Sequence, residues 1–159
     1  MFRSLRPLLL TVVATAFIAL VGEAAPVQLQ PGDKAPDFRL RGSDGKEYQL
    51  SEFRGRKAVV LMWFPRAGSQ GAKDQCAGLQ AVMAAVPADR VQVFGCSTAA
   101  LDVTTAFAQA GQYSFPILSD ADRVVAPAYG CLRSDGLSER YLFVIDEQGL
   151  IAAVNHPPH

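Results

Sequence analysis

The chain of 159 residues has little of what several function classes require. Its 15 basic and 15 acidic residues give a formal net charge of zero, which argues against nucleic acid or an anionic membrane surface as a partner. The two histidines, His156 and His159, have no third ligand near them, so we expect no metal site and interpret both as part of a frayed tail. The three cysteines, Cys76, Cys96 and Cys131, form no Cys-x-x-Cys motif, which leaves a thioredoxin-type dithiol or a zinc knuckle unsupported.

Long hydrophobic runs are scarce, and the exception is at the N-terminus. Residues 1–6 are basic, residues 8–21 are apolar apart from two threonines, and residues 22–24 offer small residues at the spacing of a cleavage site. This pattern predicts a secretory signal peptide over residues 1–24 and an exported, periplasmic or extracellular protein. An uncleaved membrane anchor is the alternative, but the run is short for a span of about 20 residues. We therefore expect no stable membrane span after cleavage.

The number of cysteines matters because export leads to an oxidising compartment, where thiols tend to pair. Three is an odd number, so at least one thiol is free or pairs between chains, and we expect a monomer or a weak dimer. Cys96 and Cys131 are most simply small buried hydrophobes, although a disulfide between them is an open alternative. Cys76 follows Lys73 near a helix start, so we expect it to be the most reactive of the three thiols.

Apolar runs and turn residues alternate along the rest of the chain. Two short segments around a Ser-Asp-Gly-Lys turn predict a hairpin, and a glycine-closed helical turn follows it. Further strands alternate with helices, which predicts an α/β fold with a mixed sheet covered on both faces. The predicted strands are 37–40, 47–50, 58–64, 91–96, 115–120, 141–146 and 150–154, and the predicted helices include 76–86, 101–110 and 122–129.

The most informative segment follows the strand at 58–64. The strand breaks at Pro65 and the chain restarts as a helix, which places backbone N–H groups and a positive dipole end at one point. Such a point suits an anion or a thiolate of low pKa. The spacing Pro65-x-x-x-Ser69-x-x-Ala72 resembles the peroxiredoxin motif Pro-x-x-x-Thr/Ser-x-x-Cys, with alanine where that family keeps its peroxide-attacking cysteine.

The resemblance to peroxiredoxins, the alkyl hydroperoxide reductase/thiol-specific antioxidant superfamily, covers about residues 30–155. It is carried by "GDKAPDF", "SDGKEYQLSEFRG", "VVLMWFPRAGSQGA", "FPILSDADRVVAPAYG" and "RYLFVIDEQGLI", and the Q-type, bacterioferritin-comigratory-protein-like branch is the most similar. It implies a single domain with a thioredoxin-like fold, an N-terminal hairpin extension and helices flanking a mixed sheet. It also implies an antioxidant thiol peroxidase that acts in redox homeostasis without a cofactor.

The family's functional roles transfer to particular positions of this chain. By resemblance, Pro65 shields the nucleophile from water, Ser69 and Arg140 hold the peroxide oxygens, and Ala72 occupies the nucleophile's position. Cys76, four residues after Ala72, matches the offset of a resolving cysteine in part of the Q-type branch. The implied substrates are hydrogen peroxide and organic hydroperoxides, and the implied reductant is thioredoxin-like.

Ala72 leaves several readings open, because a methyl group cannot attack peroxide. The alanine is either an engineered replacement or natural, in which case the chain is a pseudoenzyme or binding module on the same fold. Cys76 lies about 6 Å further along the helix, so we do not expect it to replace the missing nucleophile. A copper-delivering thioredoxin-like protein is the weakest alternative, since its Cys-x-x-x-Cys pair would here read Ala72 and Cys76.

Overall fold

A computed structural model describes residues 25–156 of the chain. The predicted signal peptide at residues 1–24 and His159 lie outside the described residues. Within residues 25–156, no helix has the length and apolar character needed to cross a membrane.

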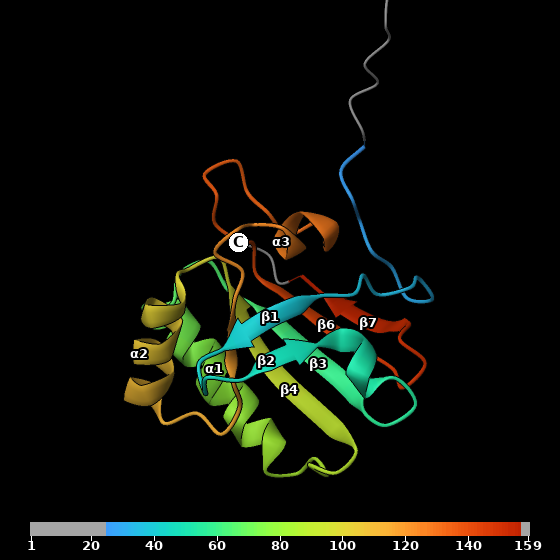
Figure 1. Ribbon diagram of the computed structural model, residues 1–159, viewed down its shortest axis with the longest axis horizontal. Coiled ribbons are helices and arrows are strands. Elements are labelled where there is room, and N and C mark those ends of the chain that lie inside the picture. The colour runs from blue at the N-terminus through green and yellow to red at the C-terminus, as the bar shows by residue number, and fades with distance from the viewer. Residues whose placement is uncertain (1–24, 157–159) are drawn as a thin grey trace, which may run out of the picture.

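The architecture is a seven-stranded mixed sheet in the order β2-β1-β5-β4-β3-β6-β7 (Figure 1). The central pairs β3–β4 and β4–β5 are parallel, and the four other pairs, including the β1–β2 hairpin, are antiparallel. This order confirms the predicted thioredoxin-like fold with its N-terminal hairpin. The strands are β1 Arg39–Gly42, β2 Glu47–Gln49, β3 Ala58–Trp63, β4 Val91–Ser97, β5 Ile117–Ser119, β6 Tyr141–Ile145 and β7 Ile151–Asn155.

Four helical segments connect the strands: η1 Leu50–Phe53, α1 Gln70–Met83, α2 Leu101–Gly111 and α3 Val125–Ala128. Helix α3 is shorter than the sequence predicts, since it has four residues where 122–129 was predicted. The carboxylate of Asp120 accepts hydrogen bonds from the backbone N–H groups of Val124, Val125 and Ala126, so it fixes the start of this short helix. Arg123, with a φ of 55°, separates it from the preceding turn.

Further corrections concern helix ends. Helix α1 runs from Gln70 to Met83 where 76–86 was predicted, so it both begins and ends earlier than predicted. Helix α2 extends to Gly111, one residue beyond the predicted limit at 110, and Gln112, with a left-handed φ of 50°, caps the helix with its N–H. The earlier start of α1 is the difference that matters for the site, because the Ser69 N-cap places position 72 in the first turn of the helix.

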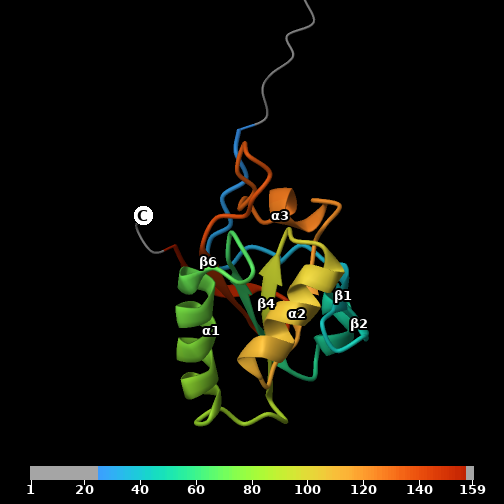
Figure 2. The ribbon, with the colours of Figure 1, turned by 90° about the vertical axis from the view of Figure 1, so that its left-hand side faces the viewer.

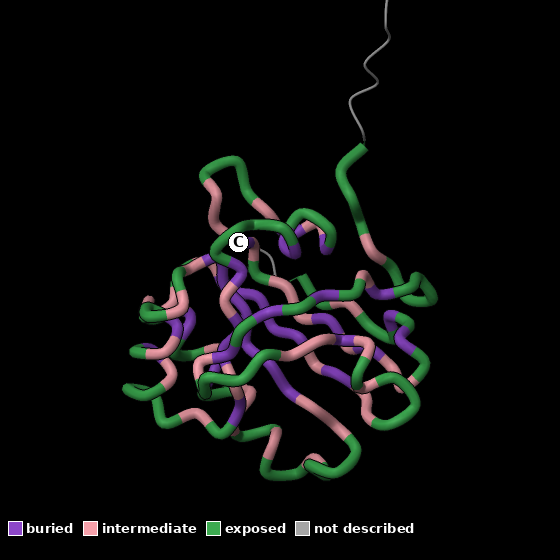
Figure 3. The backbone as a smooth tube through the Cα atoms, in the orientation of Figure 1, coloured by how far each residue is buried: buried purple, intermediate pink, exposed green. Residues whose placement is uncertain are grey.

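The core lies on both faces of the sheet, because side chains alternate along β3. Leu61 and Trp63 pack in one cluster with η1 and α3, whereas Met62 and Phe64 pack in another with α1 and α2. Figure 2 shows α1 and α2 side by side, running in the same direction from one edge of the sheet. In Figure 3 the buried residues follow the central strands, while the outer turns are exposed. The sheet is therefore covered on both faces, as predicted.

Candidate functional site

The turn between β3 and α1 contains the sequence motif. Phe64 extends the parallel ladder by one bond, since its N–H donates to the carbonyl of Cys96 at 3.1 Å. Pro65 comes next and has no N–H to donate, so the ladder ends there. Gly68 has a φ of 89°, a conformation that favours glycine and turns the chain toward the start of α1.

Ser69 is the N-cap residue of α1. Its hydroxyl accepts a hydrogen bond from the N–H of Ala72 at 3.2 Å and donates one to the carbonyl of Arg66 at 2.9 Å. This geometry orients the hydroxyl at the first turn of the helix, beside position 72. The first turn of α1 contains no acidic side chain, so the positive end of its dipole is not offset locally.

Arg140 reaches the same turn from the residue before β6. Its guanidinium lies against Gly71, so closely that a Cβ at Gly71 would overlap Nη2 and lie 3.1 Å from Cζ. The structure therefore brings Arg140 together with Ser69 and Ala72 at the start of α1. Gly71 was not singled out in the sequence, because nothing local indicates that its missing side chain makes room for a group almost 70 residues away.

Ala72 and Cys76 lie one helical turn apart on the buried face of α1. Ala72 is 1% exposed and Cys76 is 0% exposed, and both pack in the cluster that contains Phe64. Burial raises the pKa of the Cys76 thiol to about 12. Burial opposes any activation of Cys76 by the helix start one turn away, whereas its rank as the most reactive of the three thiols stays a prediction.

The two other thiols are also fully buried, as the sequence predicted for small hydrophobes. Burial raises the pKa of Cys96 and of Cys131, and the carboxylate of Asp120 adds to both shifts. All three cysteines are free thiols in the structure, and the Cys131 Sγ donates to the carbonyl of Ala126 at 3.4 Å.

The C-terminal histidine that the structure describes has a defined position. The ring of His156 stacks on Tyr141, with centroids 4.1 Å apart and planes within 1° of parallel. The frayed-tail interpretation is therefore wrong for His156. Over residues 25–156 there is no group of three or more His, Cys, Asp or Glu side chains that could hold a metal ion.

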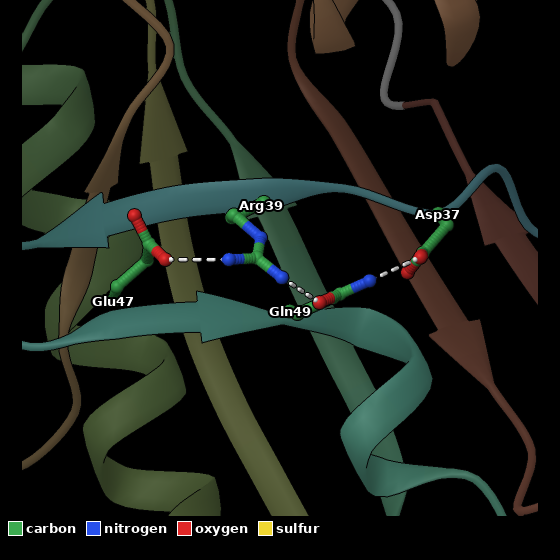
Figure 4. Close-up of polar contacts among 4 residues, drawn as sticks. All are labelled: Asp37, Arg39, Glu47 and Gln49. Carbon is green, nitrogen blue, oxygen red and sulfur yellow. Dashed lines mark hydrogen bonds and ion pairs between the residues drawn. The ribbon is translucent and has the colours of Figure 1, made fainter.

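A second polar arrangement lies on the N-terminal hairpin, away from this turn (Figure 4). Arg39 pairs with Glu47 at 3.2 Å and donates to Gln49 at 2.7 Å, and Gln49 donates to Asp37 at 2.8 Å. Burial alone would raise the pKa of Asp37, but hydrogen bonds from Gln49 and Ser51 hold it below its ordinary value. This chain of contacts fastens β1 to β2 and includes no residue of the candidate site.

A hollow next to that hairpin is separate as well. A cavity of about 540 Å³ lies between β1, the start of α2 and the segment after β5. None of its lining residues belongs to the Pro65–Ser69 turn or to α1. This hollow is therefore not part of the candidate site.

Comparisons with known proteins agree on one family. A model described as the AhpC/TSA family matches residues 31–154. The chain is 32% identical over 134 residues to peroxiredoxin Bcp of Escherichia coli strain K12, which covers 79% of this chain and 85% of that protein. The crystal structure of peroxidoxin BcpB from Mycobacterium tuberculosis is similar with a TM-score of 0.75 at 27% identity, covering 81% and 86% of the two chains.

A further similar structure is a cysteine-to-serine mutant of PrxQ from Xylella fastidiosa. Its TM-score is 0.73 at 18% identity, and the match covers 82% of this chain and 90% of that one. At this level of identity the likeness concerns the fold alone.

Proposed function

Because the chain belongs to the AhpC/TSA family, we propose that it has the site of a Q-type thiol peroxidase in which Ala72 fills the position of the nucleophile. The observation that carries this proposal is the meeting of Ser69, Ala72 and Arg140 at the first turn of α1. The relatives named above are a peroxiredoxin and a peroxidoxin, which supports a hydroperoxide as substrate and a thioredoxin-like dithiol as reductant.

The geometry suits a reaction in which negative charge develops on oxygen. A thiolate at position 72 would attack one peroxide oxygen; the S–O bond forms, the O–O bond breaks, and the second oxygen leaves as water or an alcohol after taking a proton. The guanidinium of Arg140 and the N–H groups of the first turn would stabilise the leaving oxygen, and Pro65 would limit access of water. The dithiol would then reduce the sulfenic acid, directly or through a disulfide with Cys76.

The chain with alanine at position 72 lacks the sulfur that this reaction oxidises. Cys76 does not replace it at neutral pH, because its thiol is fully buried and burial raises its pKa to about 12. The second candidate function is accordingly that of a pseudoenzyme, a binding module that keeps Ser69 and Arg140 and lacks turnover. The fully packed methyl group of Ala72, 1% exposed, is the observation that favours it.

The cellular setting is part of the proposal. The basic and apolar pattern of residues 1–24 supports a signal peptide, and thus a protein that acts outside the cytoplasm. The odd number of cysteines supports a monomer or a weak dimer. N-terminal sequencing of the protein from a bacterial host decides this point: a mature start near Ala25 supports export, and an intact Met1 on a soluble cytoplasmic product rejects it.

The test of the proposed activity compares the chain with Ala72→Cys. Hydrogen peroxide consumption is followed with a dithiol reductant, and we expect the substitution to raise the rate by about a thousandfold or more, which is about 4 kcal/mol of barrier. The matched control is Ala81→Cys, which adds a thiol at an exposed position of the same helix. Equal rates for both substitutions would show that the first turn of α1 is not a peroxidase site.

A further inference from the structure

The segment that delivers Arg140 is a tight loop held at several points. Its two ends bridge between Leu132 and Ser138, and the N–H of Glu139 donates to the carbonyl of Cys131 at 2.6 Å. At its tip, the carbonyl of Gly136 accepts from the Thr98 hydroxyl at 3.0 Å. Arg140 follows directly, so the position of its guanidinium depends on how this loop is fastened.

Ser138 fastens the loop to the other half of the candidate site. Its side chain is 0% exposed, and its hydroxyl donates to the carbonyl of Phe64 at 2.8 Å across 74 residues of sequence. The pairing of β3 with β6 ends at Trp63 and Tyr141, one residue before Phe64. The hydroxyl thus extends the connection between the two segments by one bond beyond the end of the ladder, immediately before Pro65.

This contact joins two segments whose distance from each other must stay fixed if the candidate site is to keep its geometry. Phe64 leads into the turn that places Ser69 and position 72, whereas Ser138 is two residues before Arg140. We propose that Ser138 is a positioning residue: by holding the carbonyl of Phe64 it sets the distance between the Arg140 guanidinium and the first turn of α1. The inference rests on the proposed function for its catalytic meaning, but the position of the guanidinium can be measured without any turnover.

The experiment uses the Ala72→Cys chain, whose introduced thiol reports the local charge through its pKa. The pKa is read from thiolate absorbance against pH, beside the rate with hydrogen peroxide. We expect Ser138→Ala to raise the thiol pKa by about 1, because the nearby positive charge moves away, and to lower the peroxide rate about tenfold. Ser138→Thr keeps the hydroxyl and is expected to restore both values.

A double-mutant cycle separates positioning from general structural damage. With Arg140→Gln already present, Ser138→Ala is expected to leave the thiol pKa unchanged, because no guanidinium remains to be displaced. The matched control is Ser97→Ala, which removes another fully buried hydroxyl, one that accepts the N–H of Ala99. This control is expected to leave the thiol pKa unchanged.

The outcomes are distinct. An equal rise of the thiol pKa with and without Arg140, or no rise in either background, overturns the positioning role. If Ser138→Ala does not fold, Ser138→Cys, with its weaker donor, is measured instead and is expected to give a smaller rise that also depends on Arg140. If Ala72→Cys shows no peroxide consumption, the proposed function fails, while the pKa cycle still decides whether Ser138 positions Arg140.

Discussion

Two helices of this molecule begin at the same edge of the sheet, each after a parallel strand, yet only one has the features of an anion or thiolate site (Figure 2). Helix α1 has the Ser69 hydroxyl as its cap and the Arg140 guanidinium against Gly71. Helix α2 starts after Ala100 with no side-chain cap, and its first turn carries Asp102, whose carboxylate accepts the N–H of Val103 at 2.9 Å.

The difference shows what the fold provides and what particular side chains add. A strand followed by a helix supplies free N–H groups and a positive dipole end in both places. At α2 a carboxylate offsets that potential, whereas at α1 a guanidinium adds to it. The candidate site is therefore a property of Ser69, Gly71 and Arg140, and not of the thioredoxin-like fold as such.

Filling the space at Gly71 is expected to give the largest effect among the predictions that follow. Gly71→Ala places a methyl group where the Arg140 guanidinium lies, so the guanidinium must move. In the Ala72→Cys chain we expect the peroxide rate to fall between about tenfold and a hundredfold, measured with a dithiol reductant.

The control for that substitution lies on the same helix. Gly78 has open space around its added Cβ, so Gly78→Ala is expected to leave the peroxide rate unchanged and to stabilise the helix by about 0.8–1 kcal/mol. A Gly71→Ala chain with the same rate as Gly78→Ala would show that the guanidinium contributes nothing at this turn.

The buried Cys76 thiol in the second turn of α1 predicts that the free energy of unfolding depends on pH. Burial raises the pKa of Cys76 to about 12 in the folded chain, whereas an unfolded thiol titrates near 8.5. Above about pH 8.5 the unfolded state loses this proton and the folded state keeps it, so stability falls by about 1.4 kcal/mol per pH unit until the folded thiol titrates.

Urea unfolding at pH 8 and pH 10 measures this contribution. Cys76→Ala removes the titrating group, so its loss of stability between the two pH values is expected to be smaller than that of the unchanged chain by about 2 kcal/mol. Comparing the losses, and not the absolute stabilities, cancels the packing cost of the substitution. Identical losses in the two chains would mean that Cys76 is not buried as a neutral thiol.

The smallest expected effect concerns the two helix caps. Ser69→Ala removes the hydroxyl that accepts the N–H of Ala72 and is expected to cost about 1 kcal/mol of unfolding free energy. Ala100→Ser offers α2 the cap that it lacks and is expected to add a fraction of that amount. Chemical denaturation measures the free energy of unfolding of both variants. A lower free energy of unfolding for Ala100→Ser, together with an unchanged one for Ser69→Ala, would contradict this comparison of the two caps.

The sequence predicts most of the fold because its signals are local. Apolar runs such as 58–64 and 141–146 locate the central strands, and glycines and prolines mark their ends. The short length of α3 was missed, since a single carboxylate, that of Asp120, and the left-handed Arg123 decide it.

The candidate site is predictable only in part. Ser69 and Arg140 both follow from the family resemblance, which is carried by the spacing after Pro65 and by the segment that leads into β6. Gly71 and Ser138 matter through contacts with residues some 70 positions away, which no local pattern indicates. The burial of Cys76 could not be predicted for the same reason, because it is set by elements that lie far away in the sequence.

The most direct test of the account is the pKa of a thiol introduced at the third residue of each helix. Ala72→Cys and Val103→Cys are titrated separately by thiolate absorbance, with the unchanged chain subtracted. We expect a pKa at position 72 at least about 2 below the ordinary value near 8.5, and a pKa at position 103 near or above that value beside Asp102. Equal pKa values at the two positions, or the lower value at position 103, would contradict the claim that Ser69, Gly71 and Arg140 make the start of α1 a thiolate site.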